Sequence, residues 1–182
     1  MAKAKVKELV HYVCARCDDP KKLGATKLNK VLWFTDSYAY RSLGKTITGE
    51  TAYVKRQFGP VPKHIPDVIQ ELADEAKIAV REANYFGRRK REFVSLKTPN
   101  MKSFTDDERV IIDSVMDIVC DHHTAATISD LTHNIIWDAA EMGEEIPIFA
   151  VLASEEGTIT RDDMKWATQA VKKRIEKLKA AA

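Results

Sequence analysis

Apolar residues recur every three or four positions along most of this chain, a pattern typical of amphipathic helices. The second helix of the pattern, from Lys27, is rich in aromatic residues, and Gly44 ends it. Thr105-Asp106-Asp107-Glu108 has the sequence of a capping box at the start of the fourth. We expect helices at residues 6–17, 27–43, 105–119, 128–139 and 160–178, and a third helix that begins at Pro62 or Pro66 and continues to residue 76.

Two regions depart from this pattern. Thr51–Phe58 is short, and we expect it to be extended. Lys77–Arg81 and Glu92–Leu96 flank a polar stretch that contains Gly87, which predicts a β-hairpin. The sequence therefore predicts a mainly α fold: one compact domain over residues 1–182, with about six helices, a small β-hairpin or sheet element and a lysine-rich C-terminal helix.

Composition narrows the class of protein. The 182 residues are 45% hydrophobic and 31% charged, as is usual for a globular protein, and the net charge of +2 does not indicate a polyanion-binding protein. Three cysteines, an odd number, argue against a secreted disulfide framework. The chain has neither an apolar run of the roughly 20 residues that span a membrane nor the apolar stretch of a signal peptide. We expect a cytoplasmic protein with no membrane partner.

The segment Lys27–Pro62 joins the aromatic-rich helix to a sharp Gly59-Pro60 corner. We expect Leu28, Leu32 and Phe34 in the core. Aromatic and arginine side chains are enriched at the centres of protein interfaces, so the remainder predicts a protein-binding surface. The residues assigned to this surface are Trp33, Tyr53, Arg56, Gln57, Phe58 and His133. The alternative is that Trp33 and Phe58 belong to the core on which the corner packs.

His133 and Trp137 are four residues apart, which places them side by side on the expected fifth helix. They form either a partner-facing pair or an internal one. In the internal arrangement the tryptophan fills the core and the histidine donates to a backbone carbonyl.

Three motifs occur in a defined order: Leu28-Asn29-Lys30-Val31-Leu32-Trp33-Phe34, then Phe58-Gly59-Pro60-Val61-Pro62, then Leu131-Thr132-His133 followed by Trp137. Gly143 and Ile146-Pro147 follow the tryptophan. In this combination the chain resembles the Panacea domain family, also called the SocA-like antitoxin domain or DUF4065, over roughly residues 6–166.

The resemblance implies a mainly helical domain with a small β element and an antitoxin role. Such a protein holds a cognate toxin inactive by direct contact or delivers it to a protease such as ClpXP. Many members of the family are encoded by phages and mobile elements. Neither the toxin nor the oligomeric state follows from the resemblance.

Ser129, Asp130 and His133 lie close enough in sequence to suggest a hydrolase. A working triad also needs a nucleophile on a sharp turn and oxyanion donors, and the chain has no Gly-x-Ser-x-Gly element. We therefore assign no catalytic residues and expect a protein that is not an enzyme.

Cys14 and Cys17 have the C-x-x-C spacing of metal ligands, and Cys120, His122 and His123 supply further candidates. The functional interpretation is a structural zinc ion between the first and fourth helices. Cys14 lies on the apolar stripe of its helix, however, and no second C-x-x-C completes the motif. We expect no metal and no cofactor.

The basic cluster of the predicted hairpin supports a different function. A hairpin beside helices resembles the wing of a winged-helix protein, whose arginines contact phosphates or enter a minor groove. The alternative function is therefore a nucleic-acid-binding regulator, and its candidate residues are Arg81, Arg88, Arg89, Lys90 and Arg91. Charged residues at turns are also commonly only solvated, and on strands they protect edges from aggregation.

Overall fold

The computed structural model describes residues 2–17, 19–85, 87–154 and 169. The predicted C-terminal helix at 160–178 lies outside this part of the chain, as does the side chain of Arg88. None of the described helices combines the length and the apolar content needed to cross a bilayer.

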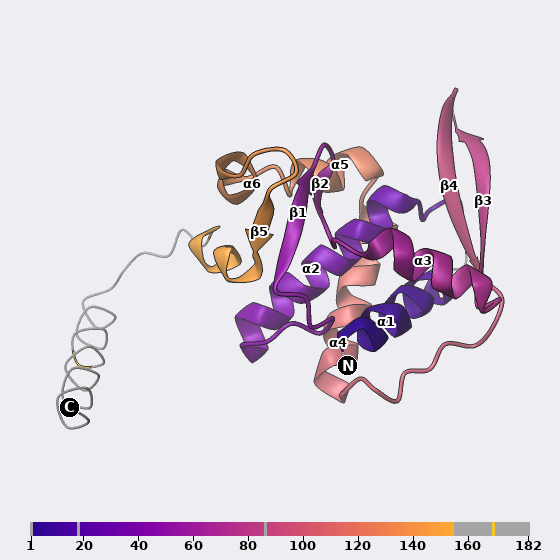
Figure 1. Cartoon of the computed structure of the whole chain (residues 1–182), viewed down its shortest axis with the longest axis horizontal. Coiled ribbons are helices and arrows are strands. Elements are labelled where there is room, and N and C mark those ends of the chain that lie inside the picture. Colours follow the sequence, from indigo (N-terminus) through magenta and orange to yellow (C-terminus); the bar gives the residue numbers. More distant parts are fainter. Residues whose placement is uncertain (1, 18, 86, 155–168, 170–182) are drawn as a thin grey trace.

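The long helix α2 (Ala25–Leu43) runs through the centre of the fold, with α1 (Ala2–Arg16) beside it (Figure 1). Gly44 ends α2 as predicted: at φ 68° it adopts the left-handed conformation and donates its backbone N–H to the Tyr40 carbonyl at 3.1 Å. α3 (Ile65–Asp74) begins with a proline in its first turn, where the missing N–H has no cost.

The predicted capping box is confirmed at the start of α4 (Asp106–Met116). The Thr105 side chain accepts from the Glu108 backbone N–H at 3.3 Å, and the Glu108 carboxylate accepts from the Thr105 N–H at 3.0 Å. The chain then continues directly into a π-helical segment, η1 (Asp117–His122).

The predicted helix at 128–139 is wrong as one element. The structure has two short helices, α5 (Ala125–Asp130) and α6 (Ile135–Ala139), separated by a turn. The physical reason is Asn134, whose side chain accepts from the backbone N–H groups of Ile136 at 3.1 Å and Trp137 at 3.3 Å and so begins a new helix. A 3-10 helix, η2 (Ile148–Ser154), follows the last strand.

The mainly α prediction is also wrong, because the chain forms two sheets. Among the described residues 52% are helical and 17% are in strands, which makes the fold mixed α/β. One sheet has the order β2-β1-β5, from β1 (Ala52–Arg56), β2 (Gly59–Val61) and β5 (Glu145–Pro147), all antiparallel. Only β1 lies in the segment that was expected to be extended. The other two strands have three residues each, too few for a period-two pattern.

The second sheet is the predicted hairpin, and it is longer than expected. β3 (Ile78–Tyr85) pairs with β4 (Arg88–Ser95) along their full length, from Ile78 opposite Ser95 to Tyr85 opposite Arg88. Figure 1 shows this two-stranded ribbon projecting from the body of the protein, on the side away from β5 and α6.

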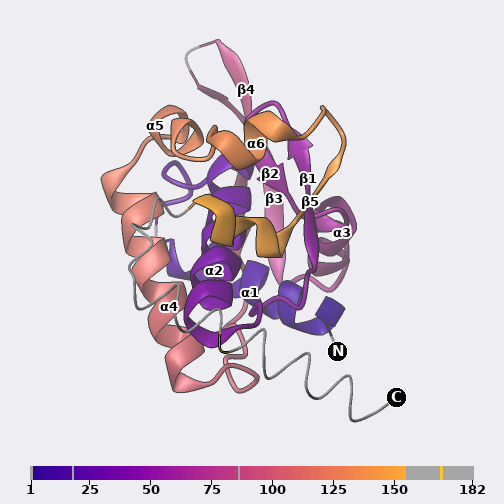
Figure 2. The ribbon, with the colours of Figure 1, turned by 90° about the vertical axis from the view of Figure 1, so that its left-hand side faces the viewer.

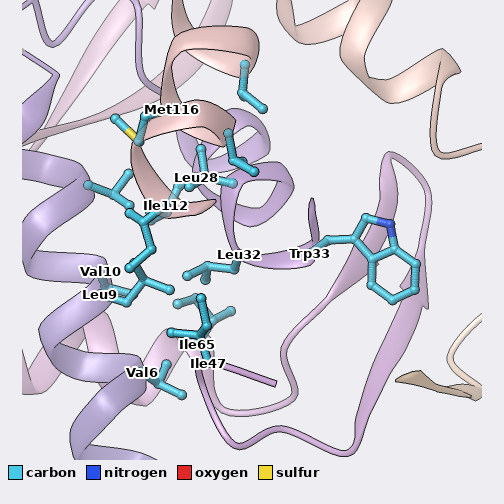
Figure 3. Packing of buried hydrophobic residues seen from close by; sticks show 14 of the residues in the cluster. Val6, Leu9, Val10, Leu28, Leu32, Trp33, Ile47, Ile65, Ile112 and Met116 are labelled. Carbon is cyan, nitrogen blue, oxygen red and sulfur yellow. The ribbon is translucent and has the colours of Figure 1, made fainter. Parts of the chain in front are cut away.

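Both sides of α2 are buried. Leu28 and Leu32 lie among side chains of α1 and α4, whereas Trp33 points the other way, toward the β1–β2 strands (Figure 3). Helix α2 therefore connects the helical core to the three-stranded sheet. Figure 2 shows the face on which that sheet meets α5 and α6.

Candidate protein-binding site

The three motifs that carry the family resemblance meet at one buried point. Gly59, at the start of β2, lies so close to α2 and to the turn after α5 that a Cβ atom there would come within 1.9 Å of Lys30 Nζ and 2.5 Å of Thr132 Oγ1. Its φ of 116° is also one that L-residues rarely adopt. Any other residue at the corner therefore meets two obstacles: a backbone conformation that disfavours L-residues, and the buried ends of the Lys30 and Thr132 side chains, which would have to shift.

Lys30 is 1% exposed and donates from its ammonium group to Thr132 Oγ1, and Thr132 in turn donates to the Ser129 carbonyl at 2.8 Å. Burial lowers the pKa of Lys30 to about 8, with the nearby charge of Asp130 opposing the effect. This chain of contacts ties α2 to the α5–α6 turn directly beneath the corner.

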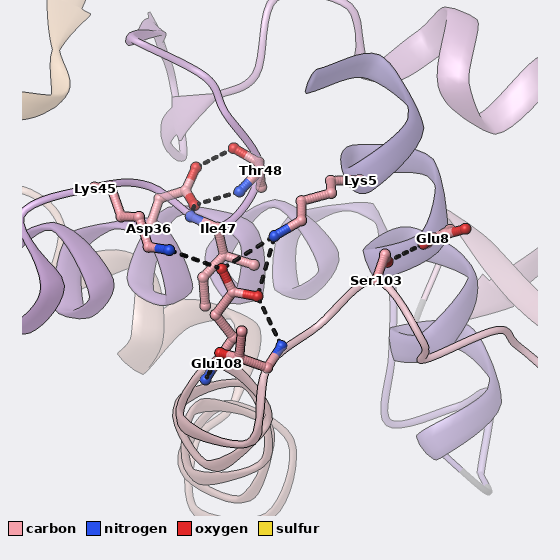
Figure 4. A network of polar contacts seen from close by, with 9 residues as sticks. Lys5, Glu8, Asp36, Lys45, Ile47, Thr48, Ser103 and Glu108 are labelled. Carbon is pink, nitrogen blue, oxygen red and sulfur yellow. Dashed lines mark hydrogen bonds and ion pairs between the residues drawn. The ribbon is translucent and has the colours of Figure 1, made fainter. Parts of the chain in front are cut away.

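A second buried polar group fixes the other end of β1. The Asp36 carboxylate accepts from the backbone N–H groups of Ile47 at 2.8 Å and Thr48 at 2.9 Å, from the Thr48 hydroxyl, and from the Tyr53 hydroxyl at 2.7 Å. Figure 4 shows the Ile47 and Thr48 contacts. Burial raises the pKa of Asp36 to about 6, although these donors favour its ionised form.

The same figure shows how α4 is attached to this region. Glu108 is 1% exposed and accepts from Lys5 at 3.0 Å, and Lys45 lies 3.7 Å from the same carboxylate. Burial opposes its ionisation, but the Thr105 N–H and the two lysines outweigh that effect and lower the pKa of Glu108.

Two residues predicted for the binding surface are instead part of the core. Tyr53 is 0% and Trp33 4% exposed, and their rings pack edge to face with centroids 5.1 Å apart. Neither ring is available to a partner in this conformation. The reason is that the sheet covers this side of α2, so a second apolar face of that helix is buried.

Arg56, Gln57 and Phe58 are exposed, as a binding surface requires. They form the tip of the β1–β2 hairpin, and Phe58 presents 57% of its surface. More than half of this residue is therefore open to a partner, and it lies beside the buried Gly59 corner that fixes the hairpin.

His133 and Trp137 stack on each other with ring centroids 4.1 Å apart, although the helix that was expected to place them is broken between them. The Trp137 indole N–H donates to the Arg56 carbonyl at 3.2 Å, and the Lys55 ammonium lies 3.7 Å from the centre of its ring. Trp137 therefore attaches α6 to the hairpin, and both rings are only partly buried. We define the tip surface as Arg56, Gln57, Phe58, His133 and Trp137.

The basic hairpin is organised differently. Successive residues of a strand point to opposite faces, so Lys90 lies on one face of the ribbon and Arg89 and Arg91 lie on the other. Arg81 bonds to Glu92 at 2.9 Å, and Lys90 lies 3.6 Å from Glu92 and donates to the Lys21 carbonyl. Arg89 and Arg91 are exposed, opposite Asn84 and Glu82. The four basic side chains that the structure describes here are therefore not gathered on one face.

Among the described residues, the side chains weighed for catalysis, those of Ser129, Asp130 and His133, form no hydrogen bond with one another. Ser129 is buried and donates its hydroxyl proton to the Ala125 carbonyl within its own helix, at 2.8 Å, whereas the His133 ring lies against Trp137. Ser129 is thus bound to the backbone of α5 rather than presented to a base.

The three cysteines are buried. Burial raises the pKa of the Cys14 thiol to about 12, whereas a hydrogen bond with Cys120 lowers the pKa of Cys17 despite its burial. In the part of the chain that the structure describes, no three His, Cys, Asp or Glu side chains are grouped so that they could hold a metal ion.

Sequence reasoning did not find the buried polar residues of this site: Lys30, Asp36, Lys55 and Thr132. A signal was present for the first two, because a lysine and an aspartate interrupt the apolar face of an aromatic-rich helix. Charged residues are almost never fully buried unless they are paired, so their position alone did not distinguish burial from exposure.

Comparison with known proteins gives one family. The family model described as Antitoxin SocA-like, Panacea domain matches residues 28–138, a range that begins on α2, includes both hairpins and ends on α6. Searches of the curated proteins and of the solved structures give no match.

Proposed function

Because the chain belongs to the SocA-like antitoxin Panacea domain family, we propose that it neutralises a cognate toxin protein by binding it, without chemistry of its own. The family match carries this proposal, since it spans the residues that build the tip surface. Membership indicates an antitoxin-type function and, in general, a toxin partner. The contact residues and the mode of neutralisation are our inference.

The tip surface supports direct contact. It places an exposed aromatic ring, an arginine and a stacked His133–Trp137 pair around a hairpin whose base is buried. Binding costs less conformational entropy when the contact residues are already held in place. The Gly59 corner and the Trp137 contact with Arg56 hold them here.

Co-expression tests the proposal. The probe is the product of a small toxic reading frame adjacent to this gene, and the readout is growth. Wild-type protein should restore growth, whereas Phe58→Asp and Arg56→Glu should not, although both remain folded. Val110→Asp is the matched control, because Val110 is 66% exposed on α4, outside the tip surface. Persistent toxicity with soluble wild-type protein present would reject the antitoxin function.

The same assay separates two modes of neutralisation. Inhibition by contact continues in a strain that lacks ClpXP, whereas delivery to that protease does not. We favour inhibition by contact, because the described residues supply a rigid surface. Toxin levels that fall in the presence of this protein, only when the protease is present, would establish delivery instead.

The alternative function is nucleic-acid binding through the β3–β4 hairpin, supported by its projection from the body and by the exposed Arg89 and Arg91. Binding to duplex DNA is measured across a salt series. Phosphate-driven binding weakens steeply with salt, and replacing Arg89 and Arg91 by glutamine should abolish it. Absence of binding at low salt rejects this alternative.

A further inference from the structure

A groove of about 340 Å³ lies between α6 and η2, beside β5. Its lining is mostly apolar: Ile135 and Ala139 come from α6, Ile146 and Pro147 from β5, and the small side chains of Ala150 and Ala153 from η2. Figure 2 shows α6 and the gold ribbon of η2 on the face turned toward the viewer. We call this feature the α6–η2 groove.

Large apolar side chains are exposed on the same two helices. Ile135 is 72% exposed at the groove itself, and Phe149 and Leu152 on η2 are 61% and 53% exposed. Helices α6 and η2 contact each other, and several large exposed apolar side chains on adjoining elements indicate an interaction site more than single scattered ones do. It indicates a partner that supplies apolar side chains.

Charge defines the partner further. Residues 110–154 contain no lysine or arginine but eight acidic residues, in a chain with a net charge of +2. Glu144 and Glu145 line the groove, and Asp138 and Glu141 are exposed next to it. Lys63 pairs with Glu145 at 3.0 Å, but both side chains are more than half exposed, and such a pair is weak. Lys55 and Arg41 also reach these segments, but each donates to a backbone carbonyl, of Ala140 at 2.9 Å and of Val151 at 2.8 Å. The four carboxylates outnumber these cations, so the rim is acidic on balance.

We propose that the α6–η2 groove docks an amphipathic segment of the toxin that carries apolar side chains along one face and lysine or arginine beside them. The inference rests on the proposed antitoxin function. The groove shares α6 with the tip surface, where Trp137 contacts Arg56, so one partner can reach both. Helix-in-groove recognition uses the same division between apolar anchors and a charged flank.

A peptide titration tests the groove without the toxin. The probe is a synthetic amphipathic helical peptide of leucine and lysine. The control peptide has glutamate in place of each lysine. Binding of each peptide to the full-length protein is followed by fluorescence anisotropy. The lysine peptide should bind and the glutamate peptide should not. Ile135→Asp and Ala150→Arg should each weaken binding at least tenfold, and Val110→Asp, far from the groove, should leave it unchanged.

Four outcomes overturn the proposal: no binding of the lysine peptide, equal binding of both peptides, unchanged binding by both groove variants, or a change with Val110→Asp as large as theirs. Two further results would show that something other than the toxin occupies the groove. Residues 160–178 contain apolar positions at helical spacing followed by lysines. If Val171→Ser with Ile175→Ser tightens peptide binding, that segment occupies the groove. If wild-type protein is dimeric and Ala150→Arg monomeric, a second copy does.

The peptide result is independent of the growth assay. If the protein restores growth but binds no peptide, the antitoxin function stands and the proposal that the groove is a docking site is rejected. The opposite result is also informative. If the peptide binds at the groove but the protein does not restore growth, the groove is a docking site and the toxin is not its partner.

Discussion

The β1–β2 and β3–β4 hairpins each contain a glycine with positive φ at the turn, 116° at Gly59 and 76° at Gly87. Around Gly59 the fold is dense, and a Cβ there would meet Lys30 Nζ and Thr132 Oγ1, whereas no atom of the described residues lies within 4 Å of a Cβ at Gly87. The turn of the first hairpin is held by residues distant in sequence. The second hairpin is anchored at its base, where Ile78 and Phe93 are buried in the core, and its turn is held mainly by its own strand pairing. A hairpin fixed at its turn, as the first is, keeps its tip in one position, which a protein interface needs.

The largest expected effect separates the two glycines directly. Gly59→Ala adds a Cβ that collides with buried atoms and strains the backbone, so we expect the free energy of unfolding to fall by more than about 3 kcal/mol. Gly87→Ala carries the backbone strain alone and should cost about 1–2 kcal/mol. Urea denaturation of both variants measures the difference, and equal losses would show that the packing at Gly59 is unimportant.

Buried carboxylates provide the next comparison. Asp36 accepts from two backbone N–H groups and two hydroxyls, and an amide at this position cannot accept them all. We expect Asp36→Asn to lower the free energy of unfolding by about 2–3 kcal/mol. Glu92→Gln, in the other hairpin, is the control and should cost about 1 kcal/mol, because Arg81 is half exposed and can turn to water. A larger loss at Glu92 would reverse the comparison.

Lys30 predicts a pH dependence. Its pKa is lowered to about 8 from 10.5, so between these values the unfolded chain binds more protons than the folded one, and stability must rise with pH. The free energy of unfolding of wild type relative to Lys30→Met should increase by up to about 3 kcal/mol from pH 8 to 10.5. Tyrosine ionisation acts on both proteins and cancels in the difference. If the difference in unfolding free energy between the two proteins does not change with pH, Lys30 is not buried as a charged group.

Local signals predicted the local structure well. The apolar period located α1 to α4, Gly44 ended α2, and the capping box at Thr105 formed as expected. Each of these depends on neighbours within about four residues. The break between α5 and α6 was missed because the apolar pattern continues through it, while Asn134 at its centre starts a new helix.

The site was predicted only in part. The exposed tip at Arg56, Gln57 and Phe58 agrees with the predicted surface in its exposure, and its role in binding stays a prediction. The burial of Trp33 and Tyr53 depends on β2 and β5, three-residue strands that the sequence pattern does not reveal. Partners far apart in sequence, such as Arg56 and Trp137 at 81 residues and Lys30 and Thr132 at 102, become visible only when the chain is folded.

The smallest expected effect concerns the charges of the projecting hairpin. Arg81 donates to Glu92 at 2.9 Å, but the arginine side chain is 58% exposed, so water competes for it. A double-mutant cycle of Arg81→Gln and Glu92→Gln should give a coupling energy below about 1 kcal/mol, measured by urea denaturation in 0.15 M salt. Raising the salt concentration should reduce it further, because exposed pairs are screened. A coupling energy above about 2 kcal/mol would mean that ion pairs as well as strand pairing hold β3 to β4. The two hairpins would then both be held by side-chain contacts, and they would differ only in whether those contacts are packing or ion pairs.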